Sequence, residues 1–405
     1  MSTPRLLRLL TASLVALCVL TGLLGLVGFL SYSQSLGRAQ HNAEQLVRVQ
    51  QIQADLLRAD AQATNAFLVG GLEPAESRAR YDAAMAETTR LVAAAAEAQP
   101  ADADALASLN DAVLRYASTV EQARANNRQG FPVGSQYLRN ASAQLRAEAL
   151  PICTALVTAN TVRTDQETGA GGGAGAIGFV VAGIVTLAAL VAAMIIVARR
   201  FRRTLNLGLV AAGVCVLVGL IIGIGVLAQV GGAVAGVREG PGRGVSAAAA
   251  VRIAANDAKA NESLTLIARG SGGAFETAWQ GLAGTVQAGF GDLATVNATQ
   301  TEDLRTRWKR YTSTHEAIRQ LDDGGQWNLA VARATGAGRD SSNVVFGTFD
   351  DGVAELLATS AAETTQDLGA PRTGLTVAAV LSILLGLGAA FAARAGIATR
   401  LKEYQ

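Results

Sequence analysis

The sequence contains few of the side chains that carry enzyme chemistry. Its 405 residues include three cysteines, seven prolines and only two histidines, His41 and His315. This scarcity argues against a histidine-based metal site or a conventional catalytic triad. Aromatic residues make up 5% of the chain and charged residues 16%, whereas a typical soluble protein is about a quarter charged. The composition therefore predicts no enzyme, no metal site and no cofactor, and it favours a membrane protein.

Long uncharged segments are what the sequence has instead. The apolar cores of these segments lie at residues 9–30, 174–198, 205–229 and 374–393. Each core reaches the roughly 20 residues that a helix needs to cross the hydrocarbon part of a bilayer. Because lipid cannot hydrogen-bond to the backbone, spans of this kind must be helical. We predict an all-α membrane protein with four transmembrane helices.

Arginines at the ends of the spans predict their orientation. Basic residues are frequent on the cytoplasmic side of membrane helices, and here they gather before the first span, between the second and third, and after the fourth. This places residues 1–8, 199–204 and 394–405 in the cytoplasm, and residues 31–173 and 230–373 on the extracytoplasmic side. The short link supplies a candidate cytoplasmic contact surface, which consists of Arg199, Arg200, Arg202 and Arg203.

The net charge of +2 is an average over these compartments. Counted separately, each extracytoplasmic segment carries −3, and the cytoplasmic pieces together carry +8. The basic residues therefore lie at membrane boundaries and do not form the basic face of a nucleic-acid-binding domain. We expect membrane lipid, and not nucleic acid, as a partner.

Both extracytoplasmic segments have the pattern of helical bundles. In the first, apolar residues recur every three or four positions from Val49 to Ala66, as one face of a helix requires. Glycine and proline divide this segment into predicted helices near residues 31–69, 75–98, 102–129 and 135–167. The second segment has predicted breaks near residues 270–273, 289–297 and 322–325, and an interruption near 336–338. A four-helix bundle fits each segment.

The two halves of the chain also resemble each other. Four positions of the first bundle are matched at identical spacing in the second, namely Leu56, Asp60, Ala63 and Phe67 by Ile253, Asp257, Ala260 and Leu264. Each group precedes a glycine-containing turn, and each half consists of a span, a bundle and a span. We predict a tandem repeat of this unit.

Asp60 and Asp257 lie on or beside the apolar face of the first helix of each predicted bundle. A buried carboxylate is costly unless it is paired. One interpretation is a salt bridge or hydrogen bond to a facing helix, through Arg115, Arg139 or an arginine of the second bundle. The other is that the two carboxylates help to bind a polar ligand within the bundles.

The turns between helices are the candidate partner-binding sites. Following the helices outward and back brings two turns of each bundle to its membrane-distal tip, where arginine, amide and aromatic groups suit a protein-binding surface. The candidate residues are Glu73, Asn126, Asn127, Arg128, Gln129 and Phe131 in the first bundle, and Arg269, Asp322 and Trp327 in the second. The alternative is ordinary helix capping, with the rings packed back into the bundles.

Glycines and other small residues occur in and beside the spans. The spacing of Gly173, Gly175 and Gly178 matches a dinucleotide-binding fingerprint, but a polar helix precedes it and a span follows, so we interpret it as a flexible hinge. Small residues one turn apart in the third and fourth spans allow close packing in lipid, either within one chain or in a homo-oligomer. They are Gly219 and Gly223, and Ser382, Gly386 and Ala390.

Each half resembles the four-helix-bundle sensor region of bacterial chemoreceptors and sensor kinases. More specifically, three segments resemble the GlnX-type membrane proteins of actinobacteria: residues 67–74 (FLVGGLEP), 126–134 (NNRQGFPVG) and 262–270 (ESLTLIARG). The four-span plan agrees. The resemblance implies that an extracytoplasmic solute-binding lipoprotein detects acidic amino acids or their amides, and that the membrane protein passes the signal to a cytoplasmic serine/threonine kinase. It carries over no catalytic or ligand-binding residue.

These features favour a non-enzymatic sensor or adaptor. Its bundles would receive a ligand or a ligand-loaded partner, and helix shifts of about 1–2 Å would continue through the spans to the cytoplasmic arginines. The alternative is a structural or tethering membrane protein that braces a complex without signalling. A transporter or channel is disfavoured because the spans carry no charged residue.

Overall fold

The computed structural model describes residues 3–70, 73–130, 132–201 and 206–401. Within these ranges the regular elements are helices and there is no strand. This confirms the prediction of an all-α membrane protein. The chain forms two compact units, each built from separate stretches of sequence.

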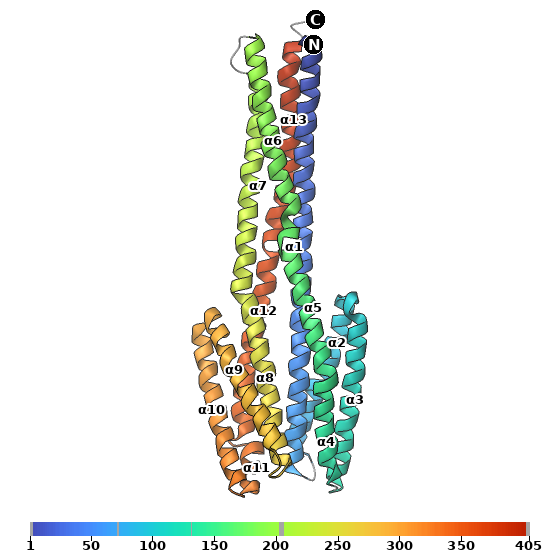
Figure 1. Ribbon diagram of the computed structural model, residues 1–405, viewed down its shortest axis with the longest axis vertical. Coiled ribbons are helices and arrows are strands. Elements are labelled where there is room, and N and C mark those ends of the chain that lie inside the picture. Colours follow the sequence, from blue (N-terminus) through green and yellow to red (C-terminus); the bar gives the residue numbers. More distant parts are fainter. Residues whose placement is uncertain (1–2, 71–72, 131, 202–205, 402–405) are drawn as a thin grey trace. The chain divides into compact units, whose positions relative to one another are not determined.

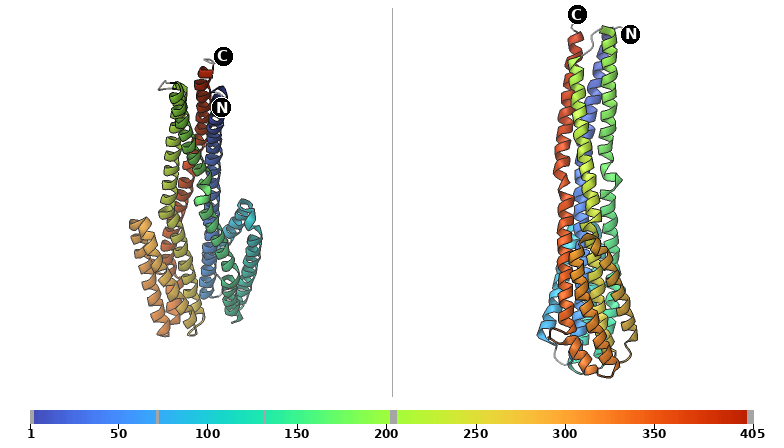
Figure 2. Two further views of the ribbon diagram at one scale, coloured as in Figure 1. Left: turned by 45° about the horizontal axis from the view of Figure 1, so that its top comes forward. Right: turned by 90° about the vertical axis from the view of Figure 1, so that its left-hand side faces the viewer.

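Unit 1 contains the apolar helices, and it comprises Met1–Gln40, Arg163–Gly236 and Gln366–Gln405. Four helices run side by side in it (Figure 1, Figure 2): the first part of α1 (Thr3–Val69), α6 (Ala170–Phe201), α7 (Leu207–Glu239) and α13 (Pro371–Leu401). The described residues include four helical stretches long and apolar enough to cross a membrane. Large apolar side chains such as Ile184, Ile221 and Leu384 are exposed on these helices, as contact with lipid would require.

Small residues let the helices of unit 1 approach one another closely. Gly386 of α13 faces Gly22 of α1, and a Cβ atom on Gly386 would lie 2.8 Å from the Gly22 Cα. The predicted small-residue stripe of the fourth span is therefore used within the chain. Gly223 of α7 makes room for a side chain instead, because a Cβ atom there would lie 2.6 Å from the ring of Phe179.

The glycine run at the start of α6 is helical, so the interpretation as a flexible hinge is wrong. Residues 173–178 lie inside α6, and the helix break falls earlier, at Gly169. The physical reason is a close helix crossing. A Cβ atom on Gly28 of α1 would lie 2.5 Å from the carbonyl carbon of Gly175. Gly175 therefore serves the contact between α1 and α6, whereas a Cβ atom on Gly178 would meet nothing within 4 Å.

Unit 2 comprises His41–Val162 and Val237–Thr365 and contains both bundles. The first three helices of the first bundle are the second part of α1, α2 (Ala75–Ala98) and α3 (Ala103–Arg128). The fourth is a continuous stretch made of α4 (Val133–Gln144), the π-helical turn η2 (Leu145–Ala149) and α5 (Leu150–Thr168). These bounds lie close to the predicted ones. Helix α1 is unbroken from Thr3 to Val69, so no turn separates the first span from the first bundle helix. Its predicted apolar face is in the core, where Val49, Ile52 and Leu56 are fully buried.

The second bundle has the same helix order with one short addition. Its helices are α8 (Pro241–Ile267), α9 (Gly273–Val296), α10 (Ala298–Asp323), α11 (Trp327–Thr335) and α12 (Ser342–Gly369). The predicted interruption near residues 336–338 is confirmed, because it falls between α11 and α12. The break predicted over residues 289–297 is confined to Asn297, whose side chain accepts a hydrogen bond from the Gln300 backbone N–H and caps α10.

The two bundles pack against each other through their first helices, α1 and α8. Ile253 and Ile267 of α8 pack on the core of the first bundle, and Val47 of α1 packs on the core of the second. The Asn343 amide of α12 also donates to the Asn65 side-chain oxygen of α1 at 2.7 Å. Most of α8 is buried as a result, and the core clusters of the two bundles are in contact through these residues.

Candidate functional site

The predicted tip residues gather at one end of unit 2. The chain enters and leaves unit 2 near residues 41, 162, 237 and 365. The opposite end holds the turns α1–α2, α3–α4, α8–α9 and α10–α11, and we call it the far end (Figure 1). Two cavities open there among the described residues, one inside the first bundle and one between the bundles.

The cavity inside the first bundle, cavity A, has a volume of about 240 Å³. Helices α1, α2, α3 and α4 all contribute to its wall. The wall combines apolar side chains with an unusual number of charged ones. The polar lining residues are Glu73, Arg78, Arg124, Asn127 and Arg128.

Arg124 is the most buried charge of cavity A. Its side chain is 9% exposed, and its guanidinium binds the Glu73 carboxylate through two contacts, Nε to Oε2 at 2.9 Å and Nη2 to Oε1 at 3.0 Å. A third contact joins Nη1 to Oε1 of Glu121 at 2.7 Å. The guanidinium also lies over the ring of Tyr81, 4.1 Å from its centroid. Two carboxylates and an aromatic face thus offset the cost of burying this cation.

Arg128 lies one helical turn after Arg124 on α3 and has a different environment. It is exposed, and its guanidinium makes no hydrogen bond or ion pair with any residue that the structure describes. The neighbouring predicted residues act in helix termination: the Asn126 amide donates to the Gln122 carbonyl at 2.8 Å, and the Gln129 backbone N–H donates to the Asn126 carbonyl at 3.2 Å. Asn126 and Gln129 therefore take part in helix termination, and their role in partner binding stays a prediction.

The second cavity, cavity B, lies between the bundles and has a volume of about 410 Å³. It brings predicted residues of both bundles together, since Asn127 lines it from α3 and Arg269 and Trp327 line it from the second bundle. The indole Nε1–H of Trp327 donates to the Leu266 carbonyl at 2.9 Å, and the Arg269 guanidinium lies 4.0 Å above the ring. The ring is thus packed back into the bundle, as the capping alternative predicts.

The backbone of Arg269 is strained. Its φ angle is +39°, in the left-handed region, and no other described non-glycine residue has a positive φ. This conformation costs about 1–2 kcal/mol for a residue with a Cβ atom. Strain of this kind is concentrated at binding and switch sites, which makes the wall of cavity B a candidate for one.

The remaining predicted site residues lie away from the cavities or outside the described residues. Asp322 accepts from Arg319 Nη1 at 2.6 Å and lines neither cavity. Arg199 is exposed near the end of α6. Outside the described residues lie Phe131, Arg202 and Arg203, together with the side chain of Arg200.

Asp60 and Asp257 meet at a single arginine, Arg146, which lies on the π-helical turn η2. Arg146 Nη1 is 3.0 Å from Asp60 Oδ2, and Arg146 Nε is 3.0 Å from Asp257 Oδ1. Asp60 is fully buried and also accepts from the Tyr116 hydroxyl at 3.2 Å and the Ser142 hydroxyl at 2.7 Å. One guanidinium from the first bundle therefore joins the matched aspartates of both bundles.

The partners that the sequence suggested for these aspartates are wrong. Arg115 instead binds Glu148 at 2.7 Å, and Arg139 donates to Gln136 at 2.7 Å. Both of these arginines point away from the seam because their side of the helix is exposed. The local sequence pattern does not say which carboxylates Arg146 meets.

The two aspartates keep the Arg146 guanidinium charged. Burial alone lowers the pKa of Arg146, but attraction to Asp60 and Asp257 raises it above its usual value. Burial raises the pKa of Asp257, and the guanidinium opposes that shift. The cluster is consistent with the salt-bridge interpretation of the two aspartates.

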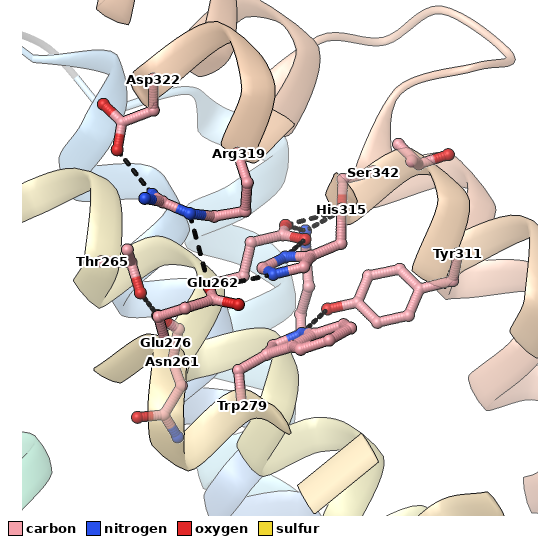
Figure 3. Close-up of polar contacts among 12 residues, drawn as sticks. Asn261, Glu262, Thr265, Glu276, Trp279, Tyr311, His315, Arg319, Asp322 and Ser342 are labelled. Carbon is pink, nitrogen blue, oxygen red and sulfur yellow. Dashed lines mark hydrogen bonds and ion pairs between the residues drawn. The ribbon is translucent and has the colours of Figure 1, made fainter. Parts of the chain in front are cut away.

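A second group of charges is buried inside the second bundle (Figure 3). Lys259 Nζ of α8 is 2.6 Å from both Glu262 Oε1 and Ser342 Oγ. The His315 ring of α10 lies between two carboxylates, with Nδ1 at 3.1 Å from Glu262 Oε2 and Nε2 at 3.1 Å from Glu276 Oε2. The side chains of Lys259, Glu262 and His315 are all almost fully buried. This cluster joins α8, α9, α10 and α12.

The His315 ring is also fixed from its faces and edges. Trp279 stacks on it with ring centroids 3.6 Å apart, and the Trp279 Nε1–H donates to the Tyr311 hydroxyl at 3.2 Å. Arg319 Nε lies 3.5 Å from the same Glu276 carboxylate. Each ring nitrogen faces a carboxylate, and this arrangement favours the protonated imidazole, in which both nitrogens donate.

The pKa values in this cluster follow from burial and pairing. Burial alone lowers the pKa of His315, but the hydrogen bonds with Glu262 and Glu276 raise it above its usual value. Despite burial, attraction to Lys259 and His315 lowers the pKa of Glu262 to about 2. Burial lowers the pKa of Lys259. The sequence pattern offers no sign of this cluster beyond the polar residues on an otherwise apolar α8.

The comparisons with known proteins bear on the first bundle. Residues 35–169 match the family model described as the actinobacterial sensor domain. The first bundle is similar to a sensor domain. No match to the chain was found among curated proteins or among solved structures. The match supports a sensing role, and the matched residues include cavity A and the Asp60–Arg146 pair.

Proposed function

We propose that this protein is a non-enzymatic transmembrane sensor or adaptor whose far end receives the signal. The observation that carries the proposal is the match of residues 35–169 to the actinobacterial sensor domain. Four helices that can cross a membrane agree with it. In this proposal the signal is a change in helix position. Helix α1 could carry it, because its first part is an apolar helix of unit 1 and its second part is a helix of the first bundle.

The far end has features that favour reception of a signal over a bracing role. Cavities A and B both open there, and both are lined by arginine. Arg128 carries a charge that no described residue compensates, and Arg269 has a strained backbone. A purely structural bundle would gain stability from filled cavities and paired charges.

The finer proposal concerns the partners. We propose that a solute-binding lipoprotein, loaded with an acidic amino acid or its amide, docks on the far end from the extracytoplasmic side. The output would reach a cytoplasmic serine/threonine kinase at the arginines of residues 199–204. The resemblance of residues 67–74 and 126–134 to GlnX-type proteins supports this proposal, as do the predicted positions of the arginines at the ends of the spans.

We further infer that the two bundles are repeats of one unit that pair within a single chain. Corresponding helices carry residues of the same type at corresponding positions; Asp60, Tyr116, Arg124 and Tyr311 are buried, and Asp257 and Arg319 are partly buried. These pairs are Asp60 and Asp257, Tyr116 and Tyr311, and Arg124 and Arg319. Contact through α1 and α8 would then let a change in one bundle act on the other.

Affinity purification tests the proposed relay. The full-length protein is purified in mild detergent, with and without acidic amino acids and their amides, and bound proteins are identified by mass spectrometry. We expect a solute-binding lipoprotein whose recovery depends on the amino acid, together with a serine/threonine kinase. Recovery of neither protein contradicts the relay, and recovery that is independent of the amino acid favours a tether.

Variants of the far end locate the docking surface in the same experiment. We expect Arg128→Ala combined with Phe131→Ala to reduce lipoprotein recovery while helix content stays unchanged. The matched control is Arg90→Ala, because Arg90 is an exposed arginine of α2 that pairs only with the neighbouring Glu87 among the described residues. Equal recovery with the wild-type protein, the double variant and the control removes the far end from the docking surface.

A further inference from the structure

The buried cation of cavity A, Arg124, is paired with a carboxylate of the same chain, Glu73. Glu73 binds the Arg124 guanidinium through both of its oxygens, in the bidentate geometry that an organic carboxylate adopts on arginine. Glu73 lies outside the helices, immediately before Pro74 and the start of α2. It can therefore leave Arg124 without breaking a helical hydrogen bond, whereas Arg124 is fixed on α3.

A second cation, Arg128, lies one turn away and has no partner among the residues that the structure describes. Arg124 and Arg128 are four residues apart on α3, so their side chains share one face of the helix, and both line cavity A. Arg78, the third arginine of the lining, is already paired with Asp82 at 3.0 Å and Glu121 at 3.2 Å. Arg128 alone among them has no described carboxylate.

The corresponding arginine of the second bundle is paired with carboxylates of its own helix. Arg319, which corresponds to Arg124, binds Asp322 and Asp323 of its own helix. These two aspartates stand at the positions of Asn127 and Arg128 in the first bundle. The second bundle thus carries carboxylates where the first has an amide, Asn127, and a cation, Arg128, that has no carboxylate partner among the described residues.

We propose that cavity A binds a small aliphatic dicarboxylate. One carboxylate replaces Glu73 on Arg124, and the other pairs with Arg128, so that the ligand both takes over the internal pairing and neutralises the free cation. Its methylene chain contacts the apolar wall, which includes Phe67, Val120 and Leu138. The volume of about 240 Å³ lies below the roughly 300–1,000 Å³ of pockets for drug-sized molecules, as a short ligand requires.

Displacement of Glu73 by the ligand would couple ligand binding to a change in the first bundle. Glu73 belongs to the α1–α2 turn, so its release from Arg124 frees the connection between the helix that continues into unit 1 and the rest of the first bundle. This step names the ligand class of the proposed sensor and rests on the proposed function. Binding itself needs neither of the proposed protein partners.

Calorimetric titration of the full-length protein in detergent tests the site, with glutarate as the dicarboxylate and butyrate as the monocarboxylate of similar length. We expect saturable binding of glutarate that is stronger than that of butyrate. Arg128→Ala should weaken glutarate binding about tenfold and leave butyrate binding unchanged, because only the dicarboxylate uses Arg128. Glu73→Gln should strengthen binding of both about tenfold, because it removes the competing carboxylate. Arg90→Ala, an exposed arginine on the same bundle, should change neither.

Two outcomes overturn the proposal. One is the absence of saturable glutarate binding to both the wild-type protein and Glu73→Gln when circular dichroism shows native helix content. The other is an equal effect of Arg128→Ala on glutarate and butyrate. Since the titration contains no lipoprotein and no kinase, its failure leaves the relay standing, and failure of the affinity purification leaves the dicarboxylate site standing.

Discussion

Buried charges in unit 2 are held by several partners at once. Arg252 of α8 binds Asp350 of α12 through Nε at 3.0 Å and Nη2 at 3.3 Å, and the Asn256 amide donates to the same carboxylate at 2.8 Å. His315 is held by two carboxylates and a stacked indole. Such networks fix one arrangement of helices, because loss of any member leaves the others buried and unpaired.

The charged state of His315 predicts a pH dependence of stability. Its folded pKa lies above the value of about 6.5 expected in the unfolded chain. The stabilisation is therefore complete below about pH 6.5 and is lost as the pH rises through the folded pKa. We expect the unfolding temperature of the full-length protein in detergent to fall as the pH is raised from 6.5, and His315→Gln to remove most of this fall.

Thermal unfolding followed by circular dichroism measures this effect, and the other histidine provides the control. The side chain of His41 is 76% exposed, so His41→Gln should keep the wild-type pH dependence. The same pH dependence in His315→Gln as in the wild type would show that His315 is not the titrating group.

Individual helices depart from regular geometry where contacts demand it. The π-helical turn Leu145–Ala149 carries Arg146 between the two aspartates, and π-helical turns of this kind are frequent at functional sites. In unit 1, glycine occurs where two helix backbones cross closely, as at Gly28 and Gly175. In both places the feature of the element follows from what it packs against and not from its own helix propensity.

The close crossing of α1 and α6 predicts opposite effects for two glycine substitutions. Gly28→Ala places a Cβ atom 2.5 Å from the Gly175 carbonyl carbon, so the helices must separate, and we expect a loss of about 1–3 kcal/mol. Gly178→Ala, in the same part of α6, meets no atom within 4 Å and should be neutral or stabilising, because alanine is the better helix former. Thermal unfolding in detergent compares them, and equal effects would refute the close crossing.

At the scale of the whole molecule, the cores of the two bundles of unit 2 are in contact. Ile253 of α8 packs on the first core and Val47 of α1 on the second, while Arg146 binds aspartates of both bundles. Cooperative unfolding is expected of two bundles that are joined by apolar packing and by a shared ion pair. Destabilisation of one bundle should therefore be felt in the other.

The distribution of tryptophan makes this coupling measurable. Trp279, Trp308 and Trp327 are the only tryptophans of the chain and all lie in the second bundle. Leu109→Ala, a truncation in the core of the first bundle, should lower stability by about 2–5 kcal/mol and shift unfolding seen by tryptophan fluorescence and by circular dichroism equally. Leu114→Ala, at a side chain that is 60% exposed, is the control. An unchanged fluorescence transition would show that the bundles unfold separately.

Much of the fold depends on local sequence patterns and could therefore be predicted from the sequence. The ends of α2 and α3, the interruption between α11 and α12 and the buried face of α1 all follow from glycine, proline and apolar spacing within a few residues. The same local reasoning misassigned the glycines 173–178, because a glycine that loosens a helix and one that packs against a neighbouring helix look identical in sequence.

The helical class, the four apolar helices and the positions of the turns could be inferred from the chain alone, since these depend on neighbours along it. Which charges meet follows from the packing of the helices. Asp60 and Asp257 share Arg146, Glu73 pairs with Arg124, and Arg128 has no partner among the described residues. Each pairing joins residues that are far apart in the sequence, and packing brings together partners that no spacing rule selects among many similar arginines.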